Sequence, residues 1–281
     1  MPSPVFTPSF GDELKRWRKA RRMSQLALAA EAGVSQRHLS FLETGRSRPS
    51  REMVIHLATM MDIPLRSRNE LLGAAGFAPL YSETGLEEPS MDQVRHVLEF
   101  LLAAHEPYPA VVLDRRWDLV EANQATTRLM GALIEPGAIA NGPTNLARLA
   151  FHPNGLRRAT VDWEHTASAL LLRLEREVAD RFGDQVLAEL LEEVLGYPGV
   201  VELRRRPRLP TGDDLLLPIH YRSDAIDVRL FSTFSTIGAS YDLTLEELRL
   251  ETFFPADTAS DAALKALAGE PQAAGATTRA G

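Results

Sequence analysis

Apolar residues between Phe10 and Ala75 recur every three or four positions, which predicts short amphipathic helices joined by tight turns. In the first of these, Leu14 and Trp17 share the side of Phe10, while lysines and arginines occupy the other side. Serines stand where helix N-caps are expected and glycines where a helix exit needs left-handed backbone: Ser24, Ser35, Ser50, Gly33 and Gly45. The pattern predicts an all-α domain of five helices over residues 1–77.

Beyond Met91 the pattern mixes helical periodicity with the two-residue alternation typical of strands. Helices are predicted at 91–105, 162–182 and 185–195. Strands are predicted at 110–113, 117–121, 226–234 and 248–254. This mixture predicts an α+β domain over residues 91–257, with an antiparallel sheet and helices packed against it.

Two segments show neither period. Residues 78–90 contain two prolines, a glycine and three glutamates, and we interpret them as a linker. From Thr258 onward the chain is rich in alanine, glycine and threonine, which predicts a disordered tail over residues 258–281.

The charge is distributed unevenly. The whole chain carries a net charge of −7, but residues 1–80 hold 12 Lys or Arg against 7 Asp or Glu, whereas the remainder holds 19 against 31. Such asymmetry is typical of a basic module that faces a polyanion, joined to an acidic module. The local sign decides phosphate contact, so the acidic total does not argue against nucleic-acid binding.

The sequence lacks the residues that several classes of chemistry require. The sequence has no cysteine, and its seven histidines include no pair at i,i+3 or i,i+4. It has neither a glycine-rich phosphate loop nor a G-x-S-x-G nucleophile elbow. We therefore expect no catalysis, no metal site and no cofactor. With no signal-peptide pattern and no apolar run of ~20 residues, we expect a cytoplasmic protein without membrane insertion.

The second and third predicted helices, joined by an Ala-Gly-Val turn, form the helix-turn-helix pattern, whose second helix enters the DNA major groove. Helical geometry puts Leu39 and Leu42 on the core side of that helix. The opposite side carries the candidate base contacts: Gln36, Arg37, Ser40 and Phe41. Glutamine suits adenine, arginine suits guanine, and an apolar ring suits a thymine methyl group. The candidate phosphate contacts are Gln25, Arg46 and Arg48.

These residues carry a family resemblance. The run from Ser24-Gln25 through Gly33-Val34-Ser35-Gln36 to Gly45-Arg46-Ser47-Arg48-Pro49-Ser50 resembles the Xre or lambda-repressor-like regulators over roughly Leu14 to Pro64. The resemblance implies a five-helix domain that binds palindromic operators in double-stranded DNA as a homodimer. It also implies base contacts at Gln36, Arg37 and Phe41, although a polar residue is common at the position of Phe41.

A second resemblance covers about Met91 to Asp257. The runs Tyr108-Pro109-Ala110-Val111-Val112-Leu113-Asp114, Phe151-His152-Pro153-Asn154-Gly155-Leu156-Arg157 and Phe253-Phe254-Pro255-Ala256-Asp257 resemble the ligand-binding domain of MmyB-like regulators. The resemblance implies a PAS-like fold whose cavity accepts a fatty acid or a similar apolar molecule.

A ligand pocket of this kind needs apolar walls and a few polar groups. The candidate polar groups are Asn123, Asn145, His152 and Arg157, and the candidate walls are Phe151, Trp163, Phe231 and Phe234. Each has a structural alternative. For Asn123 we favour the N-cap of a following helix, His152 can order a turn before Pro153, and the aromatic residues are typical of a core.

The basic run Arg204-Arg205-Arg206-Pro207-Arg208 is interpreted as an exposed loop after a helix rather than as an auxiliary DNA contact. The resulting hypothesis is a dimeric transcription regulator whose second domain senses an apolar small molecule. The alternative is a DNA-binding regulator whose second domain only dimerises or binds a protein partner. An enzyme that represses its own gene is a third, weaker alternative.

Overall fold

The computed structural model describes residues 9–135, 145–181, 184–207, 218–238 and 241–269. The chain divides into two units. The first unit consists of residues 1–84 together with residues 239–246, and the second consists of residues 85–238 and 247–281. Each unit is described by itself.

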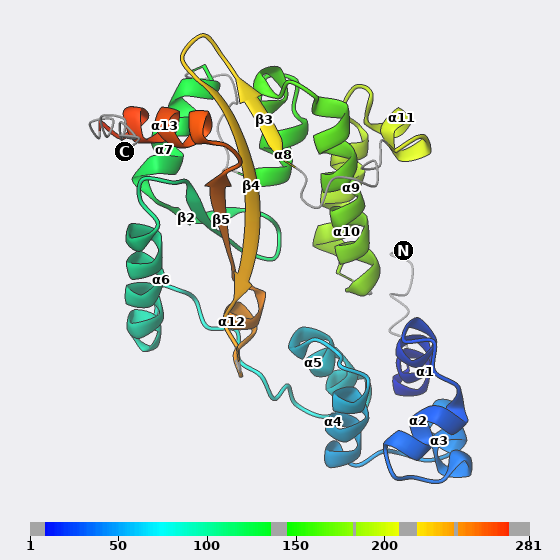
Figure 1. The fold of residues 1–281 in the computed structure, drawn as a ribbon. Helices are drawn as coiled ribbons and strands as arrows, with labels where there is room; N and C mark the ends of the chain where they lie inside the picture. The colour runs from blue at the N-terminus through cyan, green and yellow to red at the C-terminus, as the bar shows by residue number, and fades with distance from the viewer. Residues whose placement is uncertain (1–8, 136–144, 182–183, 208–217, 239–240, 270–281) are drawn as a thin grey trace, which may run out of the picture. The chain divides into compact units, whose positions relative to one another are not determined.

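The first unit is helical, as the sequence predicts (Figure 1). Among its described residues the helices are α1 (Phe10–Ala20), α2 (Gln25–Glu31), α3 (Gln36–Glu43), α4 (Arg51–Met60) and α5 (Leu65–Ala74), together with most of the short helix α12 (Leu243–Glu247). Side chains of α1 to α5 fill the core, among them Leu14, Trp17, Leu28, Leu39, Leu57 and Leu71. Burial of these apolar side chains is the main term that holds such short helices together, because helices of this length are marginal alone.

Two glycines shape the packing of the first unit. Gly33 has a φ of +64°, so it supplies the left-handed exit that turns the chain from α2 into α3. Gly11 allows α1 to lie against the end of α3, since a Cβ at this position would come within 2.6 Å of the carbonyl oxygen of Glu43. Only glycine allows that approach.

The second unit contains a five-stranded antiparallel sheet (Figure 1). The strands are β1 (Ala110–Leu113), β2 (Leu119–Ala122), β3 (Ile219–Arg222), β4 (Asp227–Thr236) and β5 (Arg249–Pro255), in the order β2-β1-β5-β4-β3. The first and last strands along the chain, β1 and β5, are paired within this sheet, because β5 inserts between β1 and β4.

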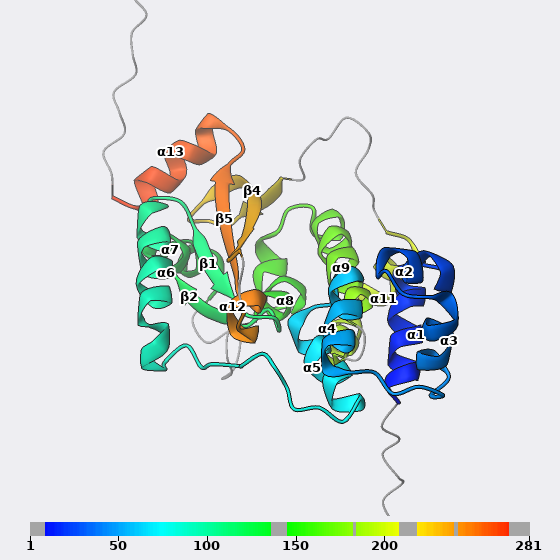
Figure 2. The ribbon, with the colours of Figure 1, turned by 90° about the horizontal axis from the view of Figure 1, so that it is seen from below.

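Helices surround this sheet. They are η1 (Pro89–Met91), α6 (Asp92–Ala104), α7 (Gln124–Leu133), α8 (Leu146–Phe151), η2 (Leu156–Ala159), α9 (Trp163–Asp180), α10 (Gln185–Leu195), α11 (Val200–Arg205) and α13 (Thr258–Leu267). Figure 2 shows α6 and α7 beside β1 and β2, and α8 between the strands and α9. One hydrophobic core joins α8 to α11 around Phe151 and Leu174, and a second joins α7, η2 and α13 to β3 and β4.

The structure corrects several sequence predictions. The prediction of a disordered tail from Thr258 is wrong for residues 258–267, which form α13: Asp257 caps this helix, and its Leu264 is buried. Residues 270–281 of that tail lie outside the described residues. The strand β3 was not predicted. The interpretation of 78–90 as a linker is also corrected, since the carbonyl of Ser82 accepts from the amide of Leu243, Thr84 donates to Asp242 within the first unit, and η1 begins at Pro89.

Candidate functional sites

The helix-turn-helix segment is built by local capping. The Ser24 Oγ accepts a 3.0 Å hydrogen bond from the amide of Ala27, and the Ser35 Oγ accepts a 3.1 Å bond from the amide of His38. Each bond satisfies an amide that the first turn of a helix leaves without a partner. Together with Gly33, these caps confirm the predicted starts of α2 and α3.

The two sides of α3 divide as predicted. Leu39 and Leu42 are buried in the core of the first unit. On the other side, Gln36 and Arg37 are exposed, and Ser40 and Phe41 are half-buried. The four candidate base contacts therefore share the outward side of one short helix, where a DNA edge can reach them.

Phe41 has a role that the sequence analysis missed. The guanidinium carbon of Arg37 lies 5.2 Å from the centre of the Phe41 ring, and that of Arg46 lies 5.9 Å from it. Both distances are within the range of cation–π attraction. The ring is therefore a platform for two arginines, and the i,i+4 spacing of Arg37 and Phe41 was the signal that could have indicated it.

A buried ion pair lies beneath this surface. Arg18 of α1 donates from Nε and Nη2 to the two carboxylate oxygens of Glu43, at 2.6 and 2.9 Å. The amide nitrogen of Gln25 donates a 2.8 Å bond to Glu43 Oε2. Burial alone would raise the pKa of Glu43, but the hydrogen bonds from Arg18 and Gln25 hold that pKa below its ordinary value. Glu43 thereby joins the first three helices.

The candidate phosphate contacts lie around this segment. Arg46 and Arg48 are exposed in the turn after α3, and Gln25 is half-buried at the first position of α2. The Gln25 amide carries two N–H groups, one of which bonds to Glu43, so the same side chain can still donate to a phosphate.

An enclosed apolar cavity of about 60 Å³ lies in the second unit, between the sheet and the helices α7, α8 and η2. Its walls are almost wholly apolar, and they include Leu129, Met130, Leu149, Leu156, Leu230 and Phe253. Thr126 and Tyr221 also belong to this lining. Burial and the nearby charge of Glu251 raise the pKa of Tyr221, so its phenol is neutral.

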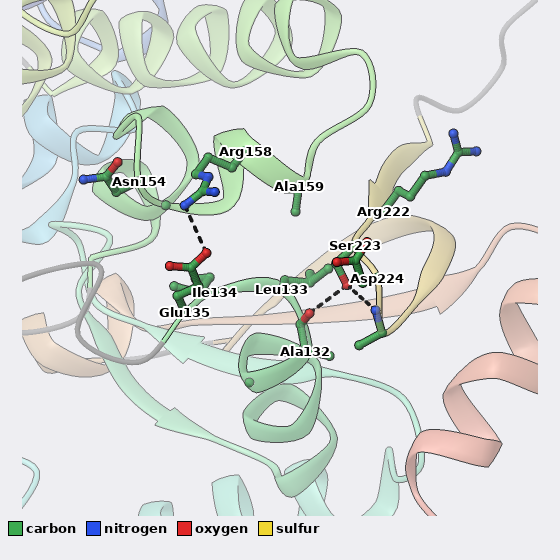
Figure 3. Close-up of a pocket in the computed structure, with 13 residues that line it drawn as sticks. Ala132, Leu133, Ile134, Glu135, Asn154, Arg158, Ala159, Arg222, Ser223 and Asp224 are labelled. Atoms are coloured by element: carbon green, nitrogen blue, oxygen red, sulfur yellow. Dashed lines mark hydrogen bonds and ion pairs between the residues drawn. The ribbon is translucent and has the colours of Figure 1, made fainter.

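A wider, polar groove of about 410 Å³ lies next along α7 (Figure 3). Arg158 and Glu135 pair across it at 3.3 Å, and the Ser223 Oγ donates to the carbonyl of Ala132 at 2.8 Å. Its residues Leu133 and Ala159 belong to the same hydrophobic cluster as Leu129 and Leu156 of the apolar cavity. The two hollows therefore border the same hydrophobic cluster from different residues.

The predicted ligand residues do not line the apolar cavity. Asn123 caps α7 through a 3.0 Å bond from the Thr126 amide, as we favoured, and Asn145 caps α8 in the same way at 3.1 Å. Phe151 is buried in the helical core, with the ring of Trp163 at its edge. The His152 Nδ1 accepts from the amide of Asn154, which confirms the turn.

The remaining candidates are held by other partners. Arg157 stacks over Trp163 at 3.5 Å, and burial lowers its pKa. Phe231 stacks on Phe254 at 5.4 Å, and Arg173 lies 3.7 Å above the ring of Phe234. Their part in ligand binding stays a prediction. The actual lining consists of ordinary aliphatic residues, which no sequence motif marks.

The basic run has a different structure from the predicted loop. Arg204 and Arg205 belong to α11, and Arg204 pairs with Glu175 at 2.7 Å. Arg208 lies outside the described residues. A cation that already has a carboxylate partner is less available to phosphate, which argues against Arg204 as a DNA contact.

A buried network of charges lies between β5 and α9. Arg173 pairs with Glu177 at 3.1 Å, and Glu177 also pairs with Arg249 and accepts from Trp117 Nε1 at 2.9 Å. Glu251 lies at the centre of the sheet. Burial raises its pKa to about 7, although the positive charge of Arg173, 3.8 Å away, works in the opposite direction. Among the described residues no donor forms a hydrogen bond with its Oε2.

A capped helix-turn-helix with an outward polar side, followed by an antiparallel sheet domain with an enclosed apolar cavity, defines a DNA-binding transcription regulator with a ligand-binding domain. The family model of the MmyB-like transcription regulator ligand binding domain matches residues 94–267, and that of the helix-turn-helix matches residues 14–67. The chain belongs to the MmyB-like transcription regulators.

A search of the curated proteins found no match to this chain. Within the residues that the structure describes, no helix is both long and apolar enough to cross a membrane.

Proposed function

We propose that this regulator binds a palindromic operator as a homodimer, with α3 in the major groove of each half-site. The observation that carries the proposal is the outward side of α3, where Gln36, Arg37 and Phe41 lie together above a rigid ion pair. A recognition helix reads bases only if its position is fixed, and the bonds of Glu43 to Arg18 and Gln25 fix it from below. The proposed place of action is the cytoplasm, where bacterial operators lie.

In the proposed complex, Gln36 pairs with an adenine and Arg37 with a guanine, and Ser40 contacts a neighbouring base edge. Phe41 supports Arg37 and Arg46 and touches a thymine methyl group if one is present. Gln25, Arg46 and Arg48 contact phosphates and set the position of the helix along the duplex.

The second domain is proposed to sense an apolar small molecule such as a fatty acid. The support is the enclosed lining of leucines, Met130 and Phe253. A volume of about 60 Å³ is far below the ~300 Å³ of ordinary ligand pockets, so a ligand has to push the walls apart. Met130 is the side chain best suited to move, because its thioether is flexible. The polar groove beside the cavity can take a polar end of the ligand.

A ligand of this kind changes the protein only if it favours one arrangement over another. The cavity has to expand to be filled, so the ligand selects a state in which α7 and η2 lie farther from the sheet. That requirement gives the ligand a differential affinity, which a preformed cavity would not.

The alternative, a second domain that only dimerises, is favoured by one observation on α6. Val97, Phe100 and Leu101 are exposed there at i, i+3 and i+4, and Phe100 is 67% exposed. These neighbours form an apolar stripe on a helix whose opposite side, with Leu98 and Leu102, is already buried. An exposed apolar stripe of this kind is typical of a protein interface. The sensor and the dimer are compatible, since they use different surfaces.

The test is mass spectrometry of an organic extract from the purified full-length protein. The matched control is the full-length variant Leu129→Trp, whose indole fills the cavity. An apolar compound that is stoichiometric in the wild-type extract and depleted from the variant supports the sensor, and operator affinity is then measured with and without that compound. Equal extracts from both proteins count against the cavity and favour the dimerisation domain. Turnover of a bound compound would instead indicate an enzyme.

A further inference from the structure

One helix of the first unit is capped from far along the chain. Helices α1 to α4 each begin after a serine whose hydroxyl accepts an amide hydrogen bond: Ser9, Ser24, Ser35 and Ser50. Helix α5 begins after Pro64, which offers no side-chain cap. Instead, the carboxylate of Glu246 accepts the amide of Leu65 at 2.9 and 3.3 Å, from 181 residues away in the sequence.

This bond is stronger than an ordinary cap. The carboxylate carries a full negative charge, and it lies at the positive end of the helix dipole. Glu246 therefore supplies to α5 both the missing acceptor and a favourable charge. Its loss exposes the first turn of α5 to fraying, because no residue next to Pro64 takes over the role.

Further contacts hold the segment that carries Glu246, residues 241–246, within the first unit. The amide of Leu243 donates to the carbonyl of Ser82 at 2.8 Å, and the Thr84 hydroxyl donates to Asp242 Oδ2 at 2.7 Å. Leu243 is buried. The segment is thus attached by backbone pairing, by a side-chain bond and by an apolar anchor, at sites separate from Glu246.

The same segment continues without interruption into the second unit. Glu247 is its next residue, and it belongs to the buried charge network through Arg115 at 3.7 Å and Arg181 at 3.8 Å. Leu248 is buried, and β5 begins at Arg249. Four residues beyond Arg249, Phe253 lines the apolar cavity. Glu246 and Glu247 are the last two residues of the short helix α12 (Leu243–Glu247), so Glu246 is connected to the cavity through the end of α12 and β5.

We propose that residues 241–246 form a coupling strap, by which a displacement of β5 at the cavity alters the capping of α5 by Glu246. The strap leads through the end of α12 into β5, which pairs with β4 over seven residue pairs. A change in the position of β5 therefore acts on Glu246 through two intervening residues, Glu247 and Leu248. The first unit thus contains a segment that is continuous with the sheet of the ligand-binding domain. A change in that sheet alters the hydrogen bonding of the first turn of α5.

Thermodynamic linkage makes this coupling reciprocal. If an altered β5 weakens the cap of α5, then loss of the cap must alter β5 by the same coupling free energy. The contacts described above lie at the first turn of α5 and at residues 82–84, so they can be tested without operator DNA. The role of a ligand as the natural cause of the β5 displacement rests on the proposed function.

The test is hydrogen–deuterium exchange of backbone amides in the full-length protein, read by NMR without DNA or ligand. In Glu246→Ala, exchange of the Leu65 amide should accelerate on the order of tenfold, while amides of α1 and α3 stay unchanged. The matched control is Glu87→Ala. Glu87 is an exposed glutamate near the boundary between the two units in the sequence, and its replacement should leave the exchange rate of the Leu65 amide unchanged. No acceleration in Glu246→Ala overturns the cap.

Coupling is tested with a second change, Phe253→Leu, which perturbs β5 conservatively at the cavity. Phe253→Leu should change the exchange of Leu65 at least threefold when Glu246 is present and should have no effect on Leu65 in Glu246→Ala. An equal effect in both backgrounds, or no effect in either, overturns the strap. Failure of the proposed function would appear differently, as absence of operator binding or of an extracted ligand while these exchange results hold.

Discussion

Arg18 and Glu43 form a bidentate ion pair with hydrogen bonds of 2.6 and 2.9 Å. This pair joins α1 to the last residue of α3. Both residues are only 8% exposed. Taking one partner away would leave a buried charge without compensation. The pair therefore fixes the angle at which the base-reading side of α3 is presented.

We expect Arg18→Ala to destabilise the first unit by about 3–5 kcal/mol, because it leaves the buried Glu43 carboxylate without its cationic partner. The double variant Arg18→Met/Glu43→Leu should recover most of that loss, because it removes both charges. Urea unfolding, followed through exchange of the α1 amides, gives the free energies. The control is Arg16→Ala, whose 3.3 Å pair with Glu13 is partly exposed and should contribute below about 1 kcal/mol. A cost for Arg18→Ala no greater than that of the control would contradict the prediction.

Acid should weaken the same unit. The pKa of Glu43 is lower in the folded protein than in the unfolded chain, so its contribution is present above the unfolded value of ~4.3 and is lost as the pH falls through the folded value. In Glu43→Gln, the stability of the first unit should vary less with pH below ~4.3 than in the wild type. The measurement is urea unfolding in acid buffers, and identical pH profiles for the two proteins would refute the assignment.

Glu251 should act with the opposite sign in the second unit. Its pKa is raised to about 7 by burial, so the folded state holds a proton that the unfolded chain releases near ~4.3. Its stabilising contribution is complete below ~4.3 and declines as the pH rises toward 7, by at most about 1.4 kcal/mol per pH unit.

The substitution Glu251→Gln mimics the protonated side chain. We expect it to remove this decline and to make the second unit more stable than the wild type above pH 7. Thermal unfolding between pH 4 and pH 8, followed by the fluorescence of Trp117, measures the difference. A Glu251→Gln variant that is less stable than the wild type at every pH would show that the charged form, paired with Arg173, is the stabilising one.

The two arginines beside Phe41, Arg37 and Arg46, should have different roles in DNA binding. Arg37→Ala should cost ~1–3 kcal/mol at one base pair and relax the preference there, whereas Arg46→Ala should weaken all sequences alike and reduce the salt dependence by about one phosphate contact. Selection from random duplexes followed by fluorescence anisotropy at several salt concentrations separates the two effects. An unchanged affinity of Arg37→Ala for the selected operator would remove Arg37 from the base contacts.

The α6 stripe should hold the homodimer together. Replacing the exposed Phe100 by glutamate puts a charge in the middle of the proposed interface, and we expect sedimentation to show a dimer for the wild type and a monomer for Phe100→Glu. Operator affinity should fall along with dimerisation. The control is Glu99→Lys, an exposed position that points about 100° away from Phe100 on the same helix and should stay dimeric. A dimeric Phe100→Glu variant would place the interface elsewhere.

Local features of the first unit could be predicted from the sequence because their causes are local. A serine cap, a glycine with φ of +64° or +70° and apolar residues at helical spacing act within four residues of one another. The same holds for Asn123, whose cap on α7 follows from its place before a helix. The outward side of α3, with Gln36 and Arg37, needs only the geometry of a single helix.

The second unit was harder to predict because its elements are short and depend on distant partners. The strand β3 has four residues, and it is a strand because β4 pairs with it. Helix α13 looked like a low-complexity tail, yet it is stabilised by burial of Leu264 and by the bond from the Arg229 amide to Ser260 Oγ. Alanine-rich composition is compatible with either state until a packing surface is known.

The sequence by itself therefore determined the helix-turn-helix, its caps, its polar outer side and the change from a helical to a mixed domain. Only the tertiary structure decided that Phe41 carries two arginines, that the cavity is lined by unremarkable leucines rather than by the predicted asparagines, and that Glu246 caps α5. The reason is physical: periodicity and capping depend on neighbours along the chain, whereas a cavity wall, a buried pKa or a cap supplied from 181 residues away depends on which segments folding brings together.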